Sequence, residues 1–340
     1  MSAHPPTHSD PASAVSAAPA PGLGEFELIR RYFERPVRRA VLGVGDDCAL
    51  LALSPGMQLA VSTDMLVEGR HFLSTVPPRR LGHKALAVNL SDLAACGARP
   101  LAFTLALSLP RADEAWVAGL AEGLFALAQE HDIELVGGDT TAGPLNLCIT
   151  VMGEVPAGQA LLRSGARPGD ELWVSGQLGD ARLALEVFRG RLALDAAAFE
   201  QVRTAMEQPQ PRVGLGLALR GLASAAIDLS DGLIGDLGHI LQRSGVGAQV
   251  QLDQLPHSAV LAAQAADLRE ECLLAGGDDY ELLFCAPEGR RDAVLGAARQ
   301  AGVPVQRIGH ITAEPGLRVN RALGQPVDLQ RLQAFDHFKS

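Results

Sequence analysis

Aspartates follow glycine or serine at several points of the chain, most of them after a run of apolar residues. They lie in segments 45–47 (Gly-Asp-Asp), 62–64 (Ser-Thr-Asp), 91–92 (Ser-Asp), 137–140 (Gly-Gly-Asp-Thr), 228–232 (Asp-Leu-Ser-Asp-Gly) and 276–279 (Gly-Gly-Asp-Asp). Carboxylates that meet inside a fold repel each other unless a positive charge lies between them. Oxygen ligands without a soft partner select Mg²⁺, Mn²⁺ or Ca²⁺. The set therefore predicts a site for hard cations and for the phosphates that such cations carry.

Asp92 is the position whose local setting argues most directly for a cation. We expect a helix that opens at Pro77 and Pro78 and ends near Cys96. Asp92 then lies near the C-terminal end of this helix, where the macrodipole disfavours negative charge by a few tenths to about 1 kcal/mol. It also falls on the apolar face, where an unpaired carboxylate costs several kcal/mol. A bound cation resolves both problems, and we favour it over a bond to an arginine or to loop amides.

The other motifs of the N-terminal half are weaker when taken alone. Asp46 and Asp139 each follow a glycine, and for either one in isolation we favour a turn or a helix N-cap. Asp64 ends an expected strand after Ser62 and Thr63, whose hydroxyls are also ligands for a hard cation. The argument for a metal site therefore depends on the whole set.

The segment from Asp228 to Gly232 gives the same choice in the C-terminal half. Alternation along the expected strand places Asp228 and Ser230 on one side. Asp231 can equally be the cap of the helix that follows. The segment does not match the EF-hand pattern, because no glutamate stands at the twelfth position of the loop.

Composition disfavours several classes of protein. The formal net charge is −10, whereas a nucleic-acid partner usually requires a basic face. Lys84 and Lys339 are the only lysines, and the sequence has no P-loop, dinucleotide fingerprint or zinc motif. No apolar run approaches the roughly eighteen residues of a membrane helix. The five cysteines lack paired spacing, so we expect reduced thiols and a cytoplasmic protein that binds neither nucleic acid nor membrane.

Alternating strand and helix patterns predict an α/β (α+β) chain of two domains. We expect a disordered tail over residues 1–24, an N-terminal domain over 25–156 that binds metal and ATP, and a C-terminal α/β domain over 157–340 that completes the site. The expected strands are 59–62, 101–109, 133–136, 147–155, 171–175, 225–229 and 280–286, with short strands near 305 and 317. The expected helices are 25–33, 77–96, 112–131, 233–244 and 289–301.

Ordered stretches between Glu25 and Phe338 resemble the thiamine-monophosphate kinase family. They cover residues 43–49, 62–72, 84–95, 137–141, 228–233 and 276–282. Val-Glu-Gly-x-His-Phe and Gly-Gly-Asp-Asp-Tyr-Glu favour this family over aminoimidazole ribonucleotide synthetase and selenophosphate synthetase, which belong to the same superfamily. The resemblance implies a synthetase-like fold of two α/β domains whose N-terminal domains pair in a homodimer. It also implies transfer of the γ-phosphoryl group of ATP to thiamine monophosphate with several Mg²⁺ ions, which gives thiamine diphosphate.

The resemblance also assigns residues of this chain to three sets of contacts. The implied metal ligands are Asp46, Ser62, Thr63, Asp64, Asp92, Asp139, Asp228 and Asp231. The implied ATP contacts are Gly138, Asp139, Arg163 and Ser230, and the implied substrate contacts are His71, Glu281 and Phe335. Because a phosphate acceptor is already ionised, no general base is assigned, and we expect direct in-line attack that depends on positioning and metal electrostatics.

Several single residues have plainer interpretations beside the functional ones. Taken alone, His71 is typical of a surface or core histidine and Glu281 of a solvent-facing charge, while Arg163 fits a phosphate contact and a solvated side chain equally well. Lys84, early in an amphipathic helix, is expected to be exposed. No role is assigned to Asp47, Asp278 or Asp279. Two other functions stay open: another ATP-dependent enzyme of the superfamily, or a non-catalytic metal- or nucleotide-binding module.

Overall fold

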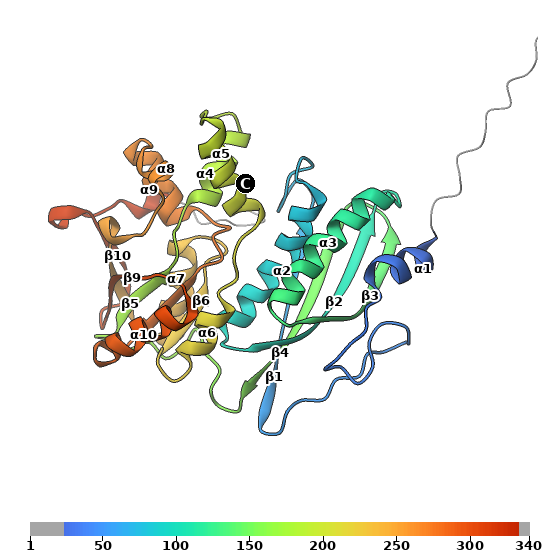
Figure 1. The fold of residues 1–340 in the computed structure, drawn as a ribbon. Helices are drawn as coiled ribbons and strands as arrows, with labels where there is room; N and C mark the ends of the chain where they lie inside the picture. Colours follow the sequence, from blue (N-terminus) through green and yellow to red (C-terminus); the bar gives the residue numbers. More distant parts are fainter. Residues whose placement is uncertain (1–23, 333–340) are drawn as a thin grey trace, which may run out of the picture.

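The computed structural model describes residues 24–332 and contains two sheets, which come from consecutive parts of the chain (Figure 1). The described part of the chain begins with helix α1 (Glu25–Leu28) and a π-helical turn, η1 (Ile29–Phe33). Together they span the helix expected over 25–33. The disordered tail expected over residues 1–24, apart from Gly24, and the expected substrate contact Phe335 lie outside the described residues. No helix within residues 24–332 combines the length and the apolar character that crossing a bilayer requires.

The N-terminal sheet has four strands in the order β1-β4-β2-β3. The strands are β1 (Met57–Val67), β2 (Arg99–Leu109), β3 (Glu134–Ala142) and β4 (Asn146–Pro156). β4 runs antiparallel to β1 and to β2, while β2 and β3 are parallel. Helices α2 (Pro78–Ala95) and α3 (Glu114–Glu130) lie side by side on one face of this sheet (Figure 1). These elements confirm the order of strands and helices predicted from the sequence.

The C-terminal sheet has six strands in the order β10-β7-β9-β5-β8-β6. The strands are β5 (Glu171–Ser175), β6 (Ala225–Asp228), β7 (Gly247–Gln251), β8 (Leu282–Ala286), β9 (Val305–Thr312) and β10 (Gly316–Asn320). The helices are α4 (Asp180–Phe188), α5 (Ala196–Glu207), α6 (Val213–Leu219), α7 (Leu233–Ser244), α8 (Ala259–Ala262), α9 (Ala266–Ala275) and α10 (Arg291–Ala301). The patterns that predict α7 and α10 are confirmed, whereas no pattern predicts β7, α4, α5, α6, α8 or α9.

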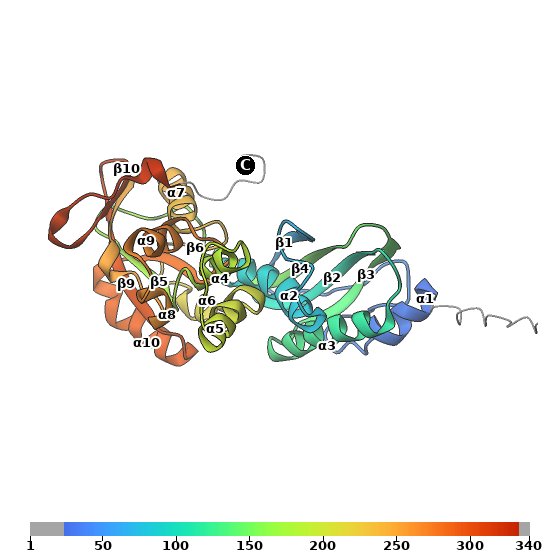
Figure 2. The same ribbon diagram turned by 90° about the horizontal axis from the view of Figure 1, so that it is seen from above.

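Helix α2 lies between the two domains. It packs on β1, β4 and α3 within its own domain, and on α5, α6 and β6 of the C-terminal domain (Figure 2). Pro78 occupies its first turn, and Gly97 follows its end with φ +65°, as expected from the sequence. Almost every side chain from Leu81 to Ala94 is buried. Contacts on several sides therefore bury polar residues of this helix, such as Lys84 and Asn89, together with its apolar ones.

Two glycines let α2 and α3 approach closely. A Cβ atom on Gly82 would lie 2.0 Å from the carbonyl oxygen of Leu120, and one on Gly123 would lie 1.8 Å from the carbonyl oxygen of Arg79. Both contacts are with backbone, which cannot move aside as a flexible side chain can. The α2–α3 spacing therefore requires glycine at both positions.

We predict that Gly82→Ala destabilises the protein, because the added methyl group forces α2 and α3 apart. The expected loss is about 1–3 kcal/mol in the free energy of unfolding, measured by urea denaturation. Gly238→Ala is the matched control, since a Cβ there meets no atom within 4 Å inside α7. That substitution should stabilise by about 0.5–1 kcal/mol. Equal effects of the two substitutions would contradict this account of the helix contact.

Candidate active site

The face of β1 that α2 covers carries two of the predicted ligands. Alternation along the strand points Ser62 and Asp64 toward the helix. The Ser62 hydroxyl donates a hydrogen bond to the Asp92 carboxylate at 2.5 Å, and the backbone amide of Asp64 donates to the side-chain oxygen of Asn89 at 3.1 Å. Asp92 therefore faces the middle of β1 from the last turns of α2. This placement confirms that Asp92 lies near the C-terminal end of its helix and turns inward. The expectation that Asp64 ends its strand is wrong, because β1 continues to Val67 along β4.

The same helix reaches the strand end of the other domain. Ser91, which precedes Asp92, donates a hydrogen bond to the Asp228 carboxylate at 2.7 Å. Asp228 ends β6 and is only 4% exposed. The Asp236 carboxylate, from the first turn of α7, accepts the backbone amide of Asp231 at 3.1 Å. Carboxylates from both domains thus meet along one side of α2.

We call Asp64, Asp92, Asp228, Asp231 and Asp236 the carboxylate cluster, because their charges act on one another. Burial, followed by the charges of Asp92 and Asp231, raises the pKa of Asp64 to about 6. Burial and then the charge of Asp92 raise the pKa of Asp228 to about 7. The pKa of Asp236 is also raised to about 7, by burial and by Asp231. The folded chain therefore holds like charges close together at a cost, as expected of a site built for cations or for protons.

Asp236 has no role in the sequence-based hypothesis, although the sequence carries a signal for it. Its neighbours at helical spacing include Leu233 and Ile240, both buried in α7. A carboxylate on the apolar face of a helix is the feature that singles out Asp92. The same test, applied to the helix that begins at Leu233, identifies Asp236.

Arg163 provides positive charge at the edge of the cluster. Burial raises the pKa of Asp92 and of Asp236, and the guanidinium of Arg163 acts on both in the opposite direction. Arg163 itself is exposed, in the segment between β4 and β5. An exposed arginine beside buried carboxylates is suited to meeting a ligand phosphate. Ser230 is half-buried in the neighbouring segment, and its carbonyl accepts the amide of Asp278 at 2.9 Å.

Three predicted metal ligands, Asp46, Thr63 and Asp139, lie apart from the cluster within this chain. Thr63 points to the opposite face of β1 from Ser62, and its hydroxyl pairs with that of Thr150 at 2.8 Å. Within one chain the Thr63 hydroxyl therefore faces away from the Asp64 carboxylate, because neighbouring residues of a strand face opposite ways. Asp46 lies in an exposed segment, where its carboxylate accepts the amide of Asp47 at 2.8 Å.

Gly138 and Asp139 occupy the far edge of the same sheet. They lie in β3, and β4 and β2 separate this strand from β1. Three strand spacings of about 4.8 Å place them roughly 14 Å from Asp64. A Cβ on Gly138 would lie 1.9 Å from the carbonyl oxygen of Leu105, so this position requires glycine for packing against β2. Within one chain, the fold does not bring Asp139 to the cluster.

The predicted substrate contacts have partners inside the chain. The Nδ1 atom of His71 accepts the backbone amide of Val67 at 3.0 Å, just after β1. Glu281 is 4% exposed, and its carboxylate accepts hydrogen bonds from Ser175 at 2.5 Å and from Nε of Arg212 at 2.6 Å. The interpretation of Glu281 as a solvent-facing charge is therefore wrong, since a buried carboxylate needs such a paired cation.

Lys84 contradicts the expectation of exposure. It is 1% exposed, and its ammonium group donates to the Asp278 carboxylate at 2.6 Å. Asp279 accepts the backbone amide of Gly179 at 2.9 Å. The two aspartates of this motif therefore have partners within the fold, and a helix of the N-terminal domain supplies one of them.

The donor set fits magnesium better than a softer metal. The cluster offers only carboxylate oxygens, with serine hydroxyls beside Asp92 and Asp228. Among residues 24–332, no three His, Cys, Asp or Glu side chains form a group that could hold an ion by themselves. Mg²⁺ does not require such a cage, since one or two carboxylates, waters and substrate phosphates commonly complete its octahedron. The residues present therefore suit an ion that arrives with a phosphate ligand.

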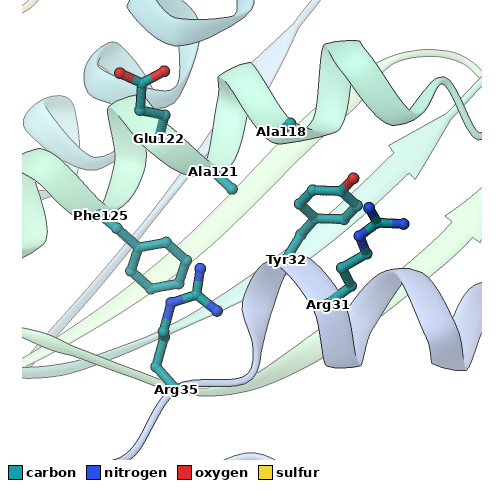
Figure 3. A pocket seen from close by; sticks show the side chains of 7 residues that line it. All are labelled: Arg31, Tyr32, Arg35, Ala118, Ala121, Glu122 and Phe125. Carbon is teal, nitrogen blue, oxygen red and sulfur yellow. The ribbon is translucent and has the colours of Figure 1, made fainter.

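A pocket of about 420 Å³ lies elsewhere, between η1 and α3 (Figure 3). Its lining residues are Arg31, Tyr32, Arg35, Ala118, Ala121, Glu122 and Phe125. The Arg35 guanidinium lies 4.7 Å from the centre of the Phe125 ring. None of the described residues assigned to metal, ATP or substrate lines this pocket. The candidate active site is therefore the carboxylate cluster where the domains meet.

We predict that the stability of the metal-free protein falls as the pH rises from about 4 to about 7. Because the pKa of Asp228 is raised from 3.8 to about 7, the folded chain binds more protons than the unfolded chain in this window. Asp228→Asn should reduce this loss in the free energy of unfolding by on the order of 2–4 kcal/mol between about pH 4 and about pH 7. Urea denaturation in a chelator from about pH 4 to about pH 7 measures the slope. The exposed Asp47→Asn is the control, and identical slopes for all three proteins would contradict the prediction.

Family models match both parts of the chain. The AIR synthase related protein N-terminal domain matches residues 45–155, and the AIR synthase related protein C-terminal domain matches residues 167–321. The thiamine-monophosphate kinase of Salmonella typhimurium is 48% identical over 323 residues, which cover 93% of this chain and 98% of the relative. The Bacillus subtilis thiamine-monophosphate kinase is 31% identical over 326 residues, which cover 93% of this chain and 100% of the relative.

Solved structures of such proteins have the same fold. The crystal structure of the thiamine-monophosphate kinase from Stenotrophomonas maltophilia has a TM-score of 0.80 and 47% identity, and the match covers 88% of this chain and 95% of that chain. The complex of AaThiL with AMPPCP and TMP has a TM-score of 0.70 and 28% identity, and the match covers 81% and 88%. The sequence motifs, the two-domain fold and the identity over most of the length agree. The chain belongs to the thiamine-monophosphate kinase family.

Proposed function

We propose that this protein transfers the γ-phosphoryl group of ATP to thiamine monophosphate and so produces thiamine diphosphate. The observation that carries the proposal is the carboxylate cluster at the meeting of the two domains, in a chain 48% identical to a thiamine-monophosphate kinase. The related AaThiL forms a complex with AMPPCP and TMP. ATP is therefore the co-substrate, and a phosphate group is the acceptor.

Charge is the main obstacle to this reaction, because donor and acceptor are both phosphate anions. Two unit charges at ~4 Å repel by ~1 kcal/mol in water and ~4 kcal/mol near a protein surface. Mg²⁺, when bound, neutralises the phosphates and stabilises the charge that develops in the transition state. Asp64, Asp92, Asp228 and Asp231 are the residues that we propose to hold these ions. Arg163 adds a fixed positive charge on the exposed side.

The protein's own contribution is positioning. An ionised acceptor needs no base to remove a proton, so the reaction depends on holding two phosphates in line. The cluster is fixed by hydrogen bonds from Ser62 and Ser91, and both anchor points lie on rigid elements rather than on loops. We propose that Gly138 and Ser230 contact ATP and that His71, Glu281 and Phe335 contact thiamine monophosphate.

We predict that Asp92→Asn abolishes most of the activity while the protein still folds. The amide keeps the shape and the hydrogen bond from Ser62, but it loses the charge that holds a cation, and we expect kcat to fall at least about 100-fold. Chromatography of thiamine diphosphate formed from ATP, Mg²⁺ and thiamine monophosphate measures the rate. Asp132→Asn, whose partner Arg38 lies on the surface, is the control.

The wild-type assay also separates the alternative functions. A binding module would bind ATP without forming product, and another enzyme of the superfamily would act on a different acceptor from a panel. Retained nucleotide binding with no thiamine diphosphate would rule out the proposed reaction. If Asp92 is only a structural partner, Asp92→Asn should lower the melting temperature and leave the remaining folded protein active.

We further propose that the protein is a homodimer joined through the N-terminal sheet. Leu59, Val61 and Met65 point away from α2 and are 46%, 57% and 53% exposed. A row of exposed apolar side chains on one sheet face is typical of an interface. A twofold axis parallel to the strands would place β3 of one sheet opposite β1 of the other. Asp139 of one copy would then lie opposite β1 of its partner, on the face that carries Thr63 and not on the face that carries Asp64.

We predict that Val61→Asp gives a monomer, because a buried unpaired charge opposes association at that face. Light scattering coupled to size exclusion measures the mass, and the kinase activity should fall at least about tenfold with it. Leu323→Asp is the matched control, since Leu323 is 98% exposed in the C-terminal domain and should leave the dimer intact. A wild-type protein that is monomeric at micromolar concentration would contradict the proposed dimer.

We also propose that the reaction takes place in the cytoplasm. All five cysteines fall within the described residues and are free thiols in the structure, and Cys272 and Cys285 are buried. Free thiols without disulfides fit a reducing compartment. Burial raises the pKa of the Cys272 thiol to about 12, so this residue is an inert core side chain.

A further inference from the structure

The sole lysine among residues 24–332 is buried where the two domains meet. Lys84 is 1% exposed in α2, and its partner Asp278 belongs to the segment between α9 and β8 of the other domain. A lysine is almost never fully buried without a partner, because removing its charge from water costs several kcal/mol. The pair therefore fixes α2 to one particular segment of the C-terminal domain.

That segment has unusual backbone geometry. Asp278 has φ +70° and Tyr280 has φ +51°, in the left-handed region that side chains other than glycine rarely adopt. Such conformations persist where the surroundings hold them, and they cluster at functional sites. The amide of Asp278 donates to the carbonyl of Ser230 at 2.9 Å, and the amide of Tyr280 donates to the carbonyl of Leu229 at 2.8 Å. The strained segment is therefore bonded directly to the stretch between Asp228 and Asp231.

Tyr280 lies between the ion pair and the carboxylate cluster. The residue is buried, and the charges of Asp278, Asp64 and Asp228 all act on its hydroxyl. The Asp278 carboxylate thus binds the Lys84 ammonium of one domain and lies beside Tyr280 of its own. A change at Lys84 would leave Asp278 with an uncompensated charge beside carboxylates that already repel each other.

We infer that Lys84 is a positioning residue for phosphoryl transfer: through Asp278 it holds the strained segment 276–281, which in turn sets Asp228 and Asp231 against Asp64 and Asp92. This inference rests on the proposed function. In this role Lys84 does not contact the substrate. Lys84 and Ser91 lie two turns apart on α2 and contact Asp278 and Asp228 of the C-terminal domain. These two contacts hold the domains at one spacing, and with them the ligand oxygens that each domain contributes.

Lys84→Met tests the inference through the dependence on Mg²⁺. Residues that orient metal ligands typically change metal affinity or activity 10–100-fold when they are replaced. We expect the Mg²⁺ concentration for half-maximal activity to rise at least about tenfold. The Mg²⁺ concentration that half-saturates the rise in melting temperature, measured in ADP without thiamine monophosphate, should shift by a similar factor. The second measurement does not require turnover.

Two further variants separate positioning from general stability. Asp278→Asn breaks the pair from the other side and should shift the Mg²⁺ dependence in the same direction. The double variant should be no worse than the more affected single one, because both act through one contact. Arg80→Met is the matched control: Arg80 also lies on α2 and pairs across the domains, with Glu200 and Glu207, but does not touch the strained segment. It should lower the melting temperature and leave the Mg²⁺ dependence unchanged.

Each outcome decides the inference. Mg²⁺ curves for Lys84→Met and Asp278→Asn that match wild type would overturn it, as would additive effects in the double variant or an equal shift in Arg80→Met. If Lys84→Met does not fold, Asp278→Asn and the control still give the answer. A wild-type protein that forms no thiamine diphosphate would instead refute the proposed function, and the melting curves in ADP would still test the role of Lys84.

Discussion

Repulsion among carboxylates around one buried helix is the constraint on which this structure depends. Helix α2 lies between two sheets and is buried on nearly all sides, yet it carries Asn89, Ser91 and Asp92 toward β1 of one domain and the end of β6 in the other. Burial and mutual charge raise the pKa of Asp64 and of Asp228 above their ordinary values. On α2, the Ser91 hydroxyl donates to the Asp228 carboxylate, and the Asn89 side chain accepts the backbone amide of Asp64. The remaining negative charge is what a magnesium-bound polyphosphate can neutralise.

The domain arrangement serves that cluster, since each domain holds only part of it. Contact between the domains is close enough to involve backbone: a Cβ on Gly216 of α6 would lie 2.0 Å from the carbonyl oxygen of Ala94 in α2. The ion pairs of Arg80 and Lys84 cross the same boundary. Close packing and paired charges both resist sliding, because interiors deform only at a cost. Oxygen atoms contributed by two domains can therefore keep the spacing that a small, rigidly coordinated ion demands.

Within a single chain, the N-terminal sheet keeps the predicted ligand Asp139 away from the carboxylate cluster. Its covered face carries Ser62 and Asp64, while its other face exposes an apolar row and its far edge carries Asp139. Strand spacing alone keeps the two edges apart. Pairing of two sheets would bury the apolar row and bring opposite edges together. One geometric feature, an open sheet of four strands, thus accounts for both the exposed surface and the separated ligand.

The elements with strong periodicity could be predicted from the sequence, as could the unfavourable setting of Asp92 for a solvated charge. Patterns of period 2 and 3.6 identify α2, α7 and the strands of the N-terminal sheet, and they place Asp92 on an apolar face. Tertiary contacts and strand order, by contrast, produce the burial of Lys84, the pairing of Glu281 with Arg212 and the distance of Asp139 from the cluster. The strand β7 and the short helices of the C-terminal domain likewise could not be predicted from local patterns. Local patterns record which face of an element is apolar, whereas these features depend on partners far away in the chain, such as Asp278 for Lys84.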